Sequence, residues 1–292
     1  MPLQATQEPA KIVEKALAAI GEIATLPEIT IRIIEIVEDP KSTARDLHDV
    51  IKNDPALSVK VLKVVNSAFY GLPGQIASVD RAIVLLGLSA VKNIAIAASI
   101  AKLFKGKRIS EQFTATDLWR HSVAVAVAAR EIAKRATKPT MLDEIFVAGL
   151  IHDLGMLVER QAFPEKLSQV IERCMREDID FQQCERELIG TDHSAFGMGL
   201  TTKWKFPRHL RAAVGFHHNP EALSEELRTI GTLMQAADVL CCHEQIGFHL
   251  TARHGTITEE MLDLLMITPA QIEEVREGLH EEVAEAEATL GG

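Results

Sequence analysis

Histidine and aspartate residues recur at spaced positions in the second half of the 292-residue chain. Seven of them stand within or beside apolar, helix-forming stretches, where polar side chains are unusual: His121, His152, Asp153, His193, His217, His218 and Asp238. Imidazole nitrogens and carboxylate oxygens together suit divalent transition metals such as Fe, Mn, Ni or Zn. The sequence therefore predicts a site for one or two such ions.

His152 and Asp153 are adjacent in the apolar run AGLIHDLGML, residues 148–157. We expect one helix over residues 141–160, and adjacent side chains on a helix point about 100° apart. Both can therefore reach a metal only if the ion lies at their shared edge. The other ligands must come from other helices, and His121 and Asp238 are the best placed. The remaining imidazoles could hold a second ion, bridged to the first by Asp153.

Each side chain also has an interpretation without a metal. His121 could be a buried neutral imidazole bonded to a carbonyl group, and His193 could lie in a solvated first turn of a helix. His217 and His218 could be favourable charges at a helix C-terminus. Asp238 is harder to dismiss, because a buried carboxylate without a partner is costly. The combination of all seven favours a metal.

Almost every periodic segment predicts a helix, and no strand alternation is visible. Asp54 before Pro55 is typical of a helix start, as are Ser42 and Ser78, while TPAQ at 268–271 predicts a capping box. Short helices are expected after Ser42, Asp54 and Ser78, and another helix is expected to follow through Ile100. The longer helices are expected over 9–24, 26–39, 117–136, 141–160, 163–177, 181–189, 192–205, 207–218, 223–243 and 269–290.

A polar, basic stretch at residues 105–112 separates two helical regions. We expect an N-terminal helical subdomain over residues 1–107 and a second helical subdomain over 108–292. Residues 259–290 hold ten acidic residues and a single arginine, so the C-terminal helix is acidic. The predicted fold class is all-α.

Composition limits the function classes. The net charge of −10 argues against a nucleic-acid-binding surface, which needs clustered Lys and Arg. A helix–glycine–helix pattern at residues 82–95 loosely resembles a helix-turn-helix, but its second piece is too apolar to face DNA. The apolar stretch 82–101 carries Lys92 and Asn93 near its centre, which disfavours a membrane span. Four cysteines without a CxxC pair fit a reducing cytoplasm.

The order of the polar motifs resembles the HD superfamily. Its pattern of a histidine, a His-Asp dyad and a distant aspartate is matched here by His121, His152-Asp153 and Asp238. More specifically, the chain resembles the HDOD (HD-related output domain) family over roughly residues 20–245. The matching stretches are LPEIT, DPALSVKVLKVVNSAFYGLPGQIASVDRAIVLLGL, LWRHSVAVA, AGLIHDLGML, DHSAFGMGL and LRAAVGFHH.

This resemblance implies an all-helical fold in which an N-terminal helical subdomain packs on an HD-type bundle. It also implies a bacterial signalling or regulatory module that acts through other signalling proteins, such as receiver domains or kinases. Oligomerisation is compatible with such a role. No nucleic-acid or membrane partner is expected.

Two departures from catalytic relatives argue against an enzyme. Those relatives, including the cyclic-di-GMP-hydrolysing HD-GYP family, usually carry a lysine just after the glycine of the dyad motif, where this chain has Met156. A lysine there can stabilise developing negative charge on phosphate, and a thioether cannot. The residues after His218, NPEALSEEL, also lack the glycine-tyrosine-proline motif. The alternative is a metal-dependent phosphohydrolase that acts on nucleotides or other phosphoesters.

Overall fold

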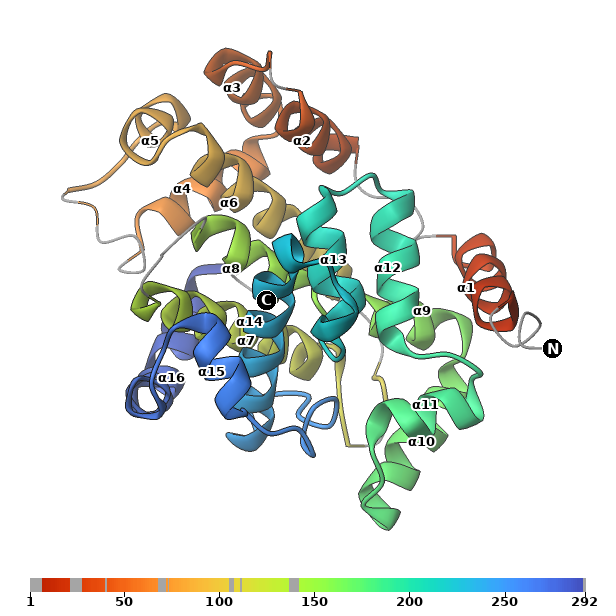
Figure 1. Ribbon diagram of the computed structural model, residues 1–292. Helices are drawn as coiled ribbons and strands as arrows, with labels where there is room; N and C mark the ends of the chain where they lie inside the picture. Colours follow the sequence, from red (N-terminus) through yellow and green to blue (C-terminus); the bar gives the residue numbers. More distant parts are fainter. Residues whose placement is uncertain are drawn as a thin grey trace.

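The computed structural model describes residues 7–21, 28–39, 41–67, 72, 74–104, 108–110, 112–136 and 142–290, and within these ranges its regular elements are all helices (Figure 1). The first elements are α1 (Gln7–Ala19), α2 (Glu28–Glu38), α3 (Ala44–Lys52), α4 (Pro55–Val65), α5 (Val79–Leu86), α6 (Leu88–Ile100) and the 3₁₀ helix η1 (Ala101–Phe104). The following ones are α7 (Ala115–Arg135), α8 (Leu142–Ile151), α9 (Leu154–Ala162), α10 (Pro164–Glu177), α11 (Phe181–Leu188), α12 (His193–Lys203), α13 (Arg208–Phe216), η2 (Pro220–Ala222), α14 (Glu225–His243), α15 (Glu259–Leu265) and α16 (Pro269–Leu290). The all-α prediction is confirmed.

Some sequence predictions fall outside the described residues. These are the end of the first helix at 22–24, the start of the second at 26–27, residues 105–107 and 111 of the expected subdomain boundary, and residue 141 at the start of a predicted helix. The division into subdomains 1–107 and 108–292 stays a prediction.

The core is centred on α7, which packs against α8, α14 and α16. Its small side chains allow these neighbours to come close. Where α7 crosses α8, a Cβ added to Gly149 would lie only 2.4 Å from Ala126 Cα. This close crossing brings the start of α7 and the end of α8 to one place in the interior, because the two helices cannot be spread apart by larger side chains.

Local capping explains several of the N-terminal helix starts. Asp54 accepts a hydrogen bond from Leu57 N at 2.9 Å, and Ser78 caps α5 as predicted. The prediction that Ser42 caps the next helix is wrong by one residue. Thr43 is the N-cap, and it forms a capping box with Asp46. The box is favoured because both side chains then satisfy free backbone N–H groups of the first turn.

Helix α6 is buried on nearly all sides, from Ala90 to Ile100. The Lys92 ammonium donates hydrogen bonds to Ile36 O at 3.0 Å and to Ser42 Oγ at 3.3 Å, which accounts for a lysine in this position. Burial lowers the pKa of Lys92. Across the described part of the chain, no helix has both the length and the apolar character that a bilayer crossing demands.

The expected single helix over residues 141–160 is instead two helices. α8 ends at Ile151 and α9 begins at Leu154, so His152 and Asp153 form the joint between them. Asp153 has φ −96° and ψ 20°, outside the helical range. The periodicity of the apolar residues continues across the joint, which is why the sequence pattern concealed the break.

Helix α1 lies at the edge of the molecule against α12 and α9 (Figure 1). It can approach α12 closely because Gly199 has no side chain there, and a Cβ at that position would lie 2.6 Å from Val13 Cγ1. Lys203 donates a hydrogen bond from Nζ to Leu17 O at 3.1 Å, satisfying a carbonyl near the C-terminus of α1. These contacts fix α1 on the outer face of the helix that begins with His193.

Candidate metal centre

The break between α8 and α9 frees the Asp153 carboxylate. Asp153 occupies the N-cap position of α9, yet its side chain makes no capping hydrogen bond, while its carbonyl accepts one from Met156 N at 3.0 Å. His152 and Asp153 are both completely buried. Because neither residue lies inside a regular helix, their side chains are not held 100° apart and can face the same point.

The first half of the site is formed by His121, His152, Asp153 and Asp238. His121 Nε2 lies 3.0 Å from Asp238 Oδ1 and 3.8 Å from Asp153 Oδ2. His152 Nε2 lies 3.4 Å from the same Asp153 Oδ2. These four residues lie close together, as the sequence predicted, although α7, the α8–α9 joint and α14 are far apart in the chain.

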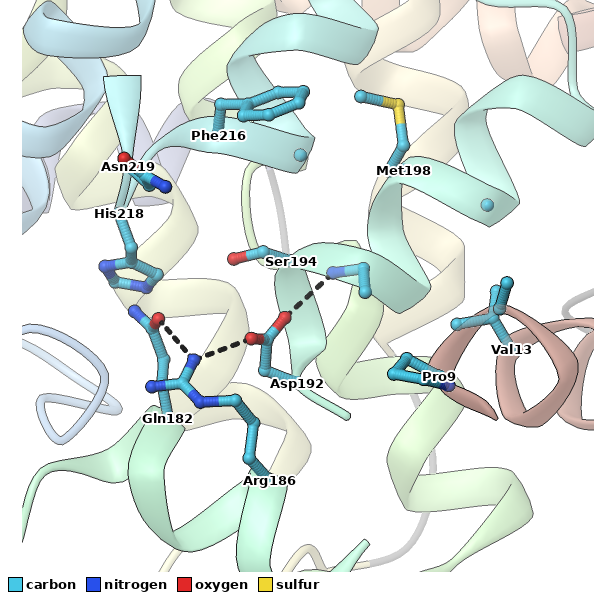
Figure 2. A pocket seen from close by; sticks show the side chains of 14 residues that line it. Pro9, Val13, Gln182, Arg186, Asp192, Ser194, Met198, Phe216, His218 and Asn219 are labelled. Carbon is cyan, nitrogen blue, oxygen red and sulfur yellow. Dashed lines mark hydrogen bonds and ion pairs between the residues drawn. The ribbon is translucent and has the colours of Figure 1, made fainter. Parts of the chain in front are cut away.

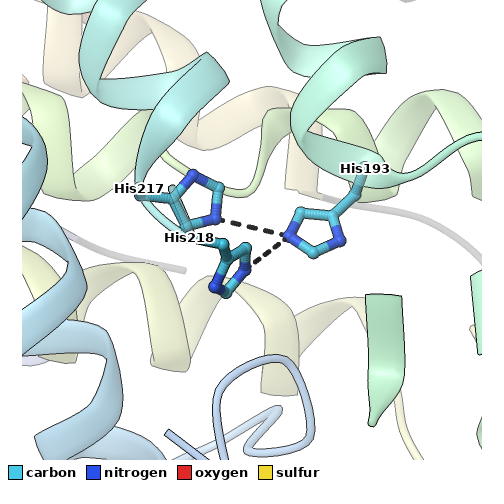
Figure 3. Close-up of side chains that lie close together, drawn as sticks. All are labelled: His193, His217 and His218. Atoms are coloured by element: carbon cyan, nitrogen blue, oxygen red, sulfur yellow. Dashed lines mark hydrogen bonds between the residues drawn. The ribbon is translucent and has the colours of Figure 1, made fainter. Parts of the chain in front are cut away.

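The second half is a group of three imidazoles, shown in Figure 3. His193 Nε2 lies 3.3 Å from His217 Nε2 and 2.9 Å from His218 Nε2. His193 is the first residue of α12, where Asp192 is the N-cap, and the other two follow the end of α13. α12 and α13 pack together, so the start of one and the end of the other are neighbours.

Asp153 joins the two halves. Its Oδ2 faces the first half, whereas its Oδ1 lies 3.4 Å from His193 Nε2 and 3.5 Å from His217 Nε2. One carboxylate thus presents one oxygen to each group, the arrangement expected of a bridging ligand. All seven residues proposed from the sequence lie in this one cluster.

The imidazole rings are turned so that Nε2 points inward. His152 Nδ1 donates to Gly149 O at 2.7 Å and His217 Nδ1 to Val214 O at 2.8 Å. Both nitrogens of His121 face acceptors, Nδ1 toward Ile246 O at 3.3 Å and Nε2 toward Asp238 Oδ1 at 3.0 Å. A carbonyl oxygen can only accept, so the proton lies on Nδ1 of the His152 and His217 rings. In the neutral ring, Nε2 then carries a lone pair directed at the centre of the cluster. Metal-ligating histidines are oriented by such outward hydrogen bonds.

Several inward-facing atoms are buried without a hydrogen-bond partner among the described residues. They are His152 Nε2, both carboxylate oxygens of Asp153 and Asp238 Oδ2. A buried polar atom left in this state costs about 1–3 kcal/mol. Because neutral His152 and His217 rings present lone pairs rather than N–H groups to Asp153, they cannot satisfy its carboxylate. A divalent cation would satisfy both kinds of atom, so the residues present fit a metal.

The protonation states also favour metal binding. Burial opposes charge on Asp153 and Asp238, but the surrounding imidazoles outweigh it and hold the pKa of both carboxyl groups below the usual range. Burial lowers the pKa of His217 and His218. Ionised carboxylates and neutral imidazoles are the forms that bind metal ions. His152 differs, because the Asp153 carboxylate outweighs burial and raises its pKa.

Two buried glutamates beside the cluster were missed by the sequence predictions. Glu185 of α11 accepts a hydrogen bond from His193 Nδ1 at 2.8 Å, which orients that ring as the carbonyl groups orient the others. Glu159 of α9 is also completely buried, and burial raises the pKa of both glutamates well above the usual range. Glu185 lies four residues after Phe181 and beside Cys184, on the buried face of α11, so its place on the apolar side of that helix is the signal that could have found it.

Cys242 is a further neighbour that the sequence did not single out. Its thiol donates to Asp238 Oδ1 at 3.4 Å. Asp238 and Cys242 are four residues apart on α14, so a helical i, i+4 search around Asp238 would have found it. Burial raises the pKa of the Cys242 thiol well above its usual value, which favours a hydrogen-bond donor over a thiolate ligand.

We expect Glu185→Gln to weaken metal binding at the three-histidine half about tenfold, because the neutral amide no longer increases the basicity of His193. Competition titration with a chromophoric chelator measures the affinity. The matched control is Glu187→Gln, which removes an exposed carboxylate from the same helix. Equal affinities of the two variants would show that Glu185 does not support the site.

The comparison with known families bears directly on this cluster. A model of the HDOD domain matches residues 23–220, about two thirds of the chain. This chain belongs to the HDOD domain family. Six of the seven clustered residues lie within the matched HDOD range, and Asp238 lies beyond its end. The family resemblance seen in the sequence is thus confirmed.

Solved structures share the HDOD fold. An HDOD domain protein of unknown function from Geobacter sulfurreducens superposes with a TM-score of 0.82 at 24% identity, covering 97% of this chain and 99% of its own. A protein named "Putative signal transduction protein" from Marinobacter aquaeolei VT8 has a TM-score of 0.78 at 22% identity, covering 99% and 66%. A "Putative metal-dependent phosphohydrolase" from Shewanella amazonensis SB2B has a TM-score of 0.65 at 20% identity, covering 98% and 99%. At these identities the likeness shows the fold alone.

Among curated proteins, the HDOD chain is 25% identical over 211 residues to an uncharacterized protein of Treponema pallidum (strain Nichols). That match covers 72% of this chain and 40% of the relative. The chain therefore spans less than half the length of this curated relative.

Proposed function

We propose that this HDOD protein is a bacterial regulatory module of signal transduction, acting mainly through other signalling proteins, in which the histidine–aspartate cluster holds one or two divalent transition metal ions. The observation that carries the metal assignment is the set of buried, inward-facing atoms without a hydrogen-bond partner among the described residues, at Asp153 above all. The metal would have a structural or sensory role.

The position after the dyad's glycine supports regulation rather than hydrolysis. Met156 is completely buried in α9, and its thioether cannot stabilise negative charge on a phosphoryl group. A cytoplasmic location agrees with four free cysteines, since reduced thiols persist in a reducing compartment. Receiver domains or kinases remain the proposed partners, and oligomerisation is compatible with this role.

We expect protein purified without added metal to carry about one equivalent or more of a transition metal. Loss of the metal is expected in both His152→Ala and Asp238→Ala, because each variant removes a donor from the first half of the cluster. Elemental analysis provides the measurement, and circular dichroism checks that each variant keeps its helicity. Metal-free wild-type protein would contradict the metal assignment.

The second candidate function is a metal-dependent phosphohydrolase. It is favoured by one observation, the bridging placement of Asp153 between two groups of ligands. A bound divalent ion would supply Lewis-acid chemistry at a phosphoryl oxygen. Asp153 and Asp238 would orient the reacting groups, and His218, the least buried of the seven, could assist proton transfer.

Assays with metal-loaded protein separate the two functions. A panel of nucleotides, cyclic dinucleotides and simple phosphoesters is offered to the wild type and to His152→Ala. The regulatory proposal expects no turnover that depends on His152. Hydrolysis by the wild type that disappears in His152→Ala would establish the phosphohydrolase instead.

A further inference from the structure

A cavity of about 790 Å³ lies between α1, α11, α12 and the end of α13, and it reaches the metal cluster at His218 (Figure 2). Small-molecule sites in proteins have volumes of about 300–1,000 Å³. Of the seven clustered residues, His218 alone lines this cavity. Its side chain is 9% exposed, whereas the others have no exposed surface. The cavity is thus a route from solvent to the cluster.

One side of the cavity is polar and carries a fixed arginine. Arg186 donates from Nη1 to Asp192 Oδ2 at 2.8 Å and to Gln182 Oε1 at 3.2 Å. Asp192 also accepts a hydrogen bond from Ala195 N at the start of α12, so its charge is divided between the arginine and the helix N-terminus. The Arg186 side chain is 51% exposed, which leaves its other N–H groups within reach of a ligand.

Ser194 provides a second polar group on the same side. Its hydroxyl oxygen is buried, lines the cavity and has no hydrogen-bond partner among the described residues. Figure 2 shows the hydroxyl directed toward the part of the cavity where His218 lies. A hydroxyl in that state can donate to an oxyanion placed between it and the imidazole.

The opposite side of the cavity is apolar. Pro9 and Val13 of α1 face Met198 of α12 and Phe216 of α13 across the space. α1 therefore completes the pocket, and a ligand with an apolar body would contact α1 and α12 together. The two sides require a molecule with an anionic head and an apolar remainder.

We propose that this cavity binds a small amphiphilic anion, with a phosphate or carboxylate head group between Arg186, Ser194 and His218 and an apolar body against Phe216, Met198 and α1. The inference rests on the proposed function in one respect, because a metal held by His218 would attract the same head group. Arg186 and Ser194 belong to the pocket and not to the metal cluster. Ligand binding would link the position of α1 to the occupancy of the cluster.

Isothermal titration calorimetry on the full chain tests the pocket with three probes. Phenylphosphonate carries a phosphate-like head that cannot be hydrolysed at an ester bond, phenylacetate carries a carboxylate, and 2-phenylethanol is neutral. We expect at least one anion to bind about tenfold more tightly than the alcohol, and the tighter anion identifies the head group.

Arg186→Gln should weaken binding of that anion about tenfold, because one charge-assisted contact is lost. The control is Arg208→Gln, which removes another surface arginine with a carboxylate partner, outside the cavity. Binding of the alcohol as tightly as the anions, equal behaviour of the two variants, or no binding would overturn the inference.

Metal content, determined on the same samples, separates this inference from the proposed function. Anion binding that depends on Arg186 in protein without metal would support the pocket while removing the metal assignment. Metal-loaded protein that binds none of the probes would retain the metal assignment and exclude the pocket.

Discussion

Gly155→Ala is expected to destabilise the protein by about 3 kcal/mol or more, the largest effect of any single methyl group in the site. A Cβ on Gly155 would lie 1.8 Å from His193 O and 2.8 Å from Gly197 N. These are backbone atoms, so no side chain can rotate away, and α9 and α12 would have to separate. Chemical denaturation monitored by circular dichroism measures the loss.

A matched control is Gly278→Ala in α16. There the added Cβ would meet only a glutamate oxygen at 3.5 Å, and alanine favours a helix interior by about 1 kcal/mol over glycine. We expect this control to be neutral or stabilising. If the two variants had similar stabilities, the close crossing of α9 and α12 would not be the feature that requires Gly155.

The crossing also has a consequence for the proposed metal site. Asp153 precedes α9 and His193 begins α12, so the distance between them is set by how closely these two helices approach. Any Gly155→Ala protein that still folds should lose metal from the three-histidine half first. Gly155, the glycine of the dyad motif, is thus required for the close packing of α9 and α12, whether or not the site is catalytic.

Asp153→Asn is expected to remove metal from both halves of the cluster, leaving about a tenth of the wild-type content or less. The Asp153 carboxylate offers one oxygen to each half. In asparagine one of these oxygens is replaced by an NH2 group, which does not bind a metal ion. His193→Ala should instead lower only the affinity of the three-histidine half. Elemental analysis after gel filtration compares the variants.

Thermal unfolding provides an independent check of Asp153. Chelator should lower the melting temperature of the wild type, because metal that binds only the folded chain contributes about 4 kcal/mol when present at a thousand times its dissociation constant. Asp153→Asn should not respond to chelator. The control Asp180→Asn, at an N-cap where asparagine also serves, should respond as the wild type does. A chelator response in Asp153→Asn would show that metal binds elsewhere.

The sequence was sufficient for the helical class, because apolar residues repeat with the period of a helix and caps such as Asp54 mark where helices begin. It also singled out the seven residues that cluster in the structure, since histidines and aspartates in apolar stretches are costly without partners. It failed at the α8–α9 joint, because Gly149 lies inside α8 and the apolar periodicity continues past His152, so nothing in the pattern marks the break. Tertiary packing decides such a break, and the local pattern does not record it.

The role of Glu185 and the cavity at His218 could not be predicted from the sequence for a different reason. Glu185 is completely buried on the face of α11 that also holds Phe181 and Cys184, but the helical pattern does not say which groups that face meets. That face packs against α10 and also meets His193 at the start of α12, whose Nδ1 donates to Glu185 at 2.8 Å. The same holds for the cavity at His218, whose walls come from α1 and from helices more than 150 residues later in the chain. Only the arrangement of helices reveals either feature.

Three of the histidines take their orientation from carbonyl oxygens, those of Gly149, Val214 and Ile246. Every amino acid carries this oxygen, so the direction of each ring is determined by where the backbone runs. The side chains of Val214 and Ile246 can therefore change without turning the imidazoles, provided the helices keep their places, whereas Gly149 is required by the close crossing of α7 and α8. The orientation of these three rings is therefore set by the path of the backbone. A sequence comparison does not detect the carbonyl groups that hold the rings in place.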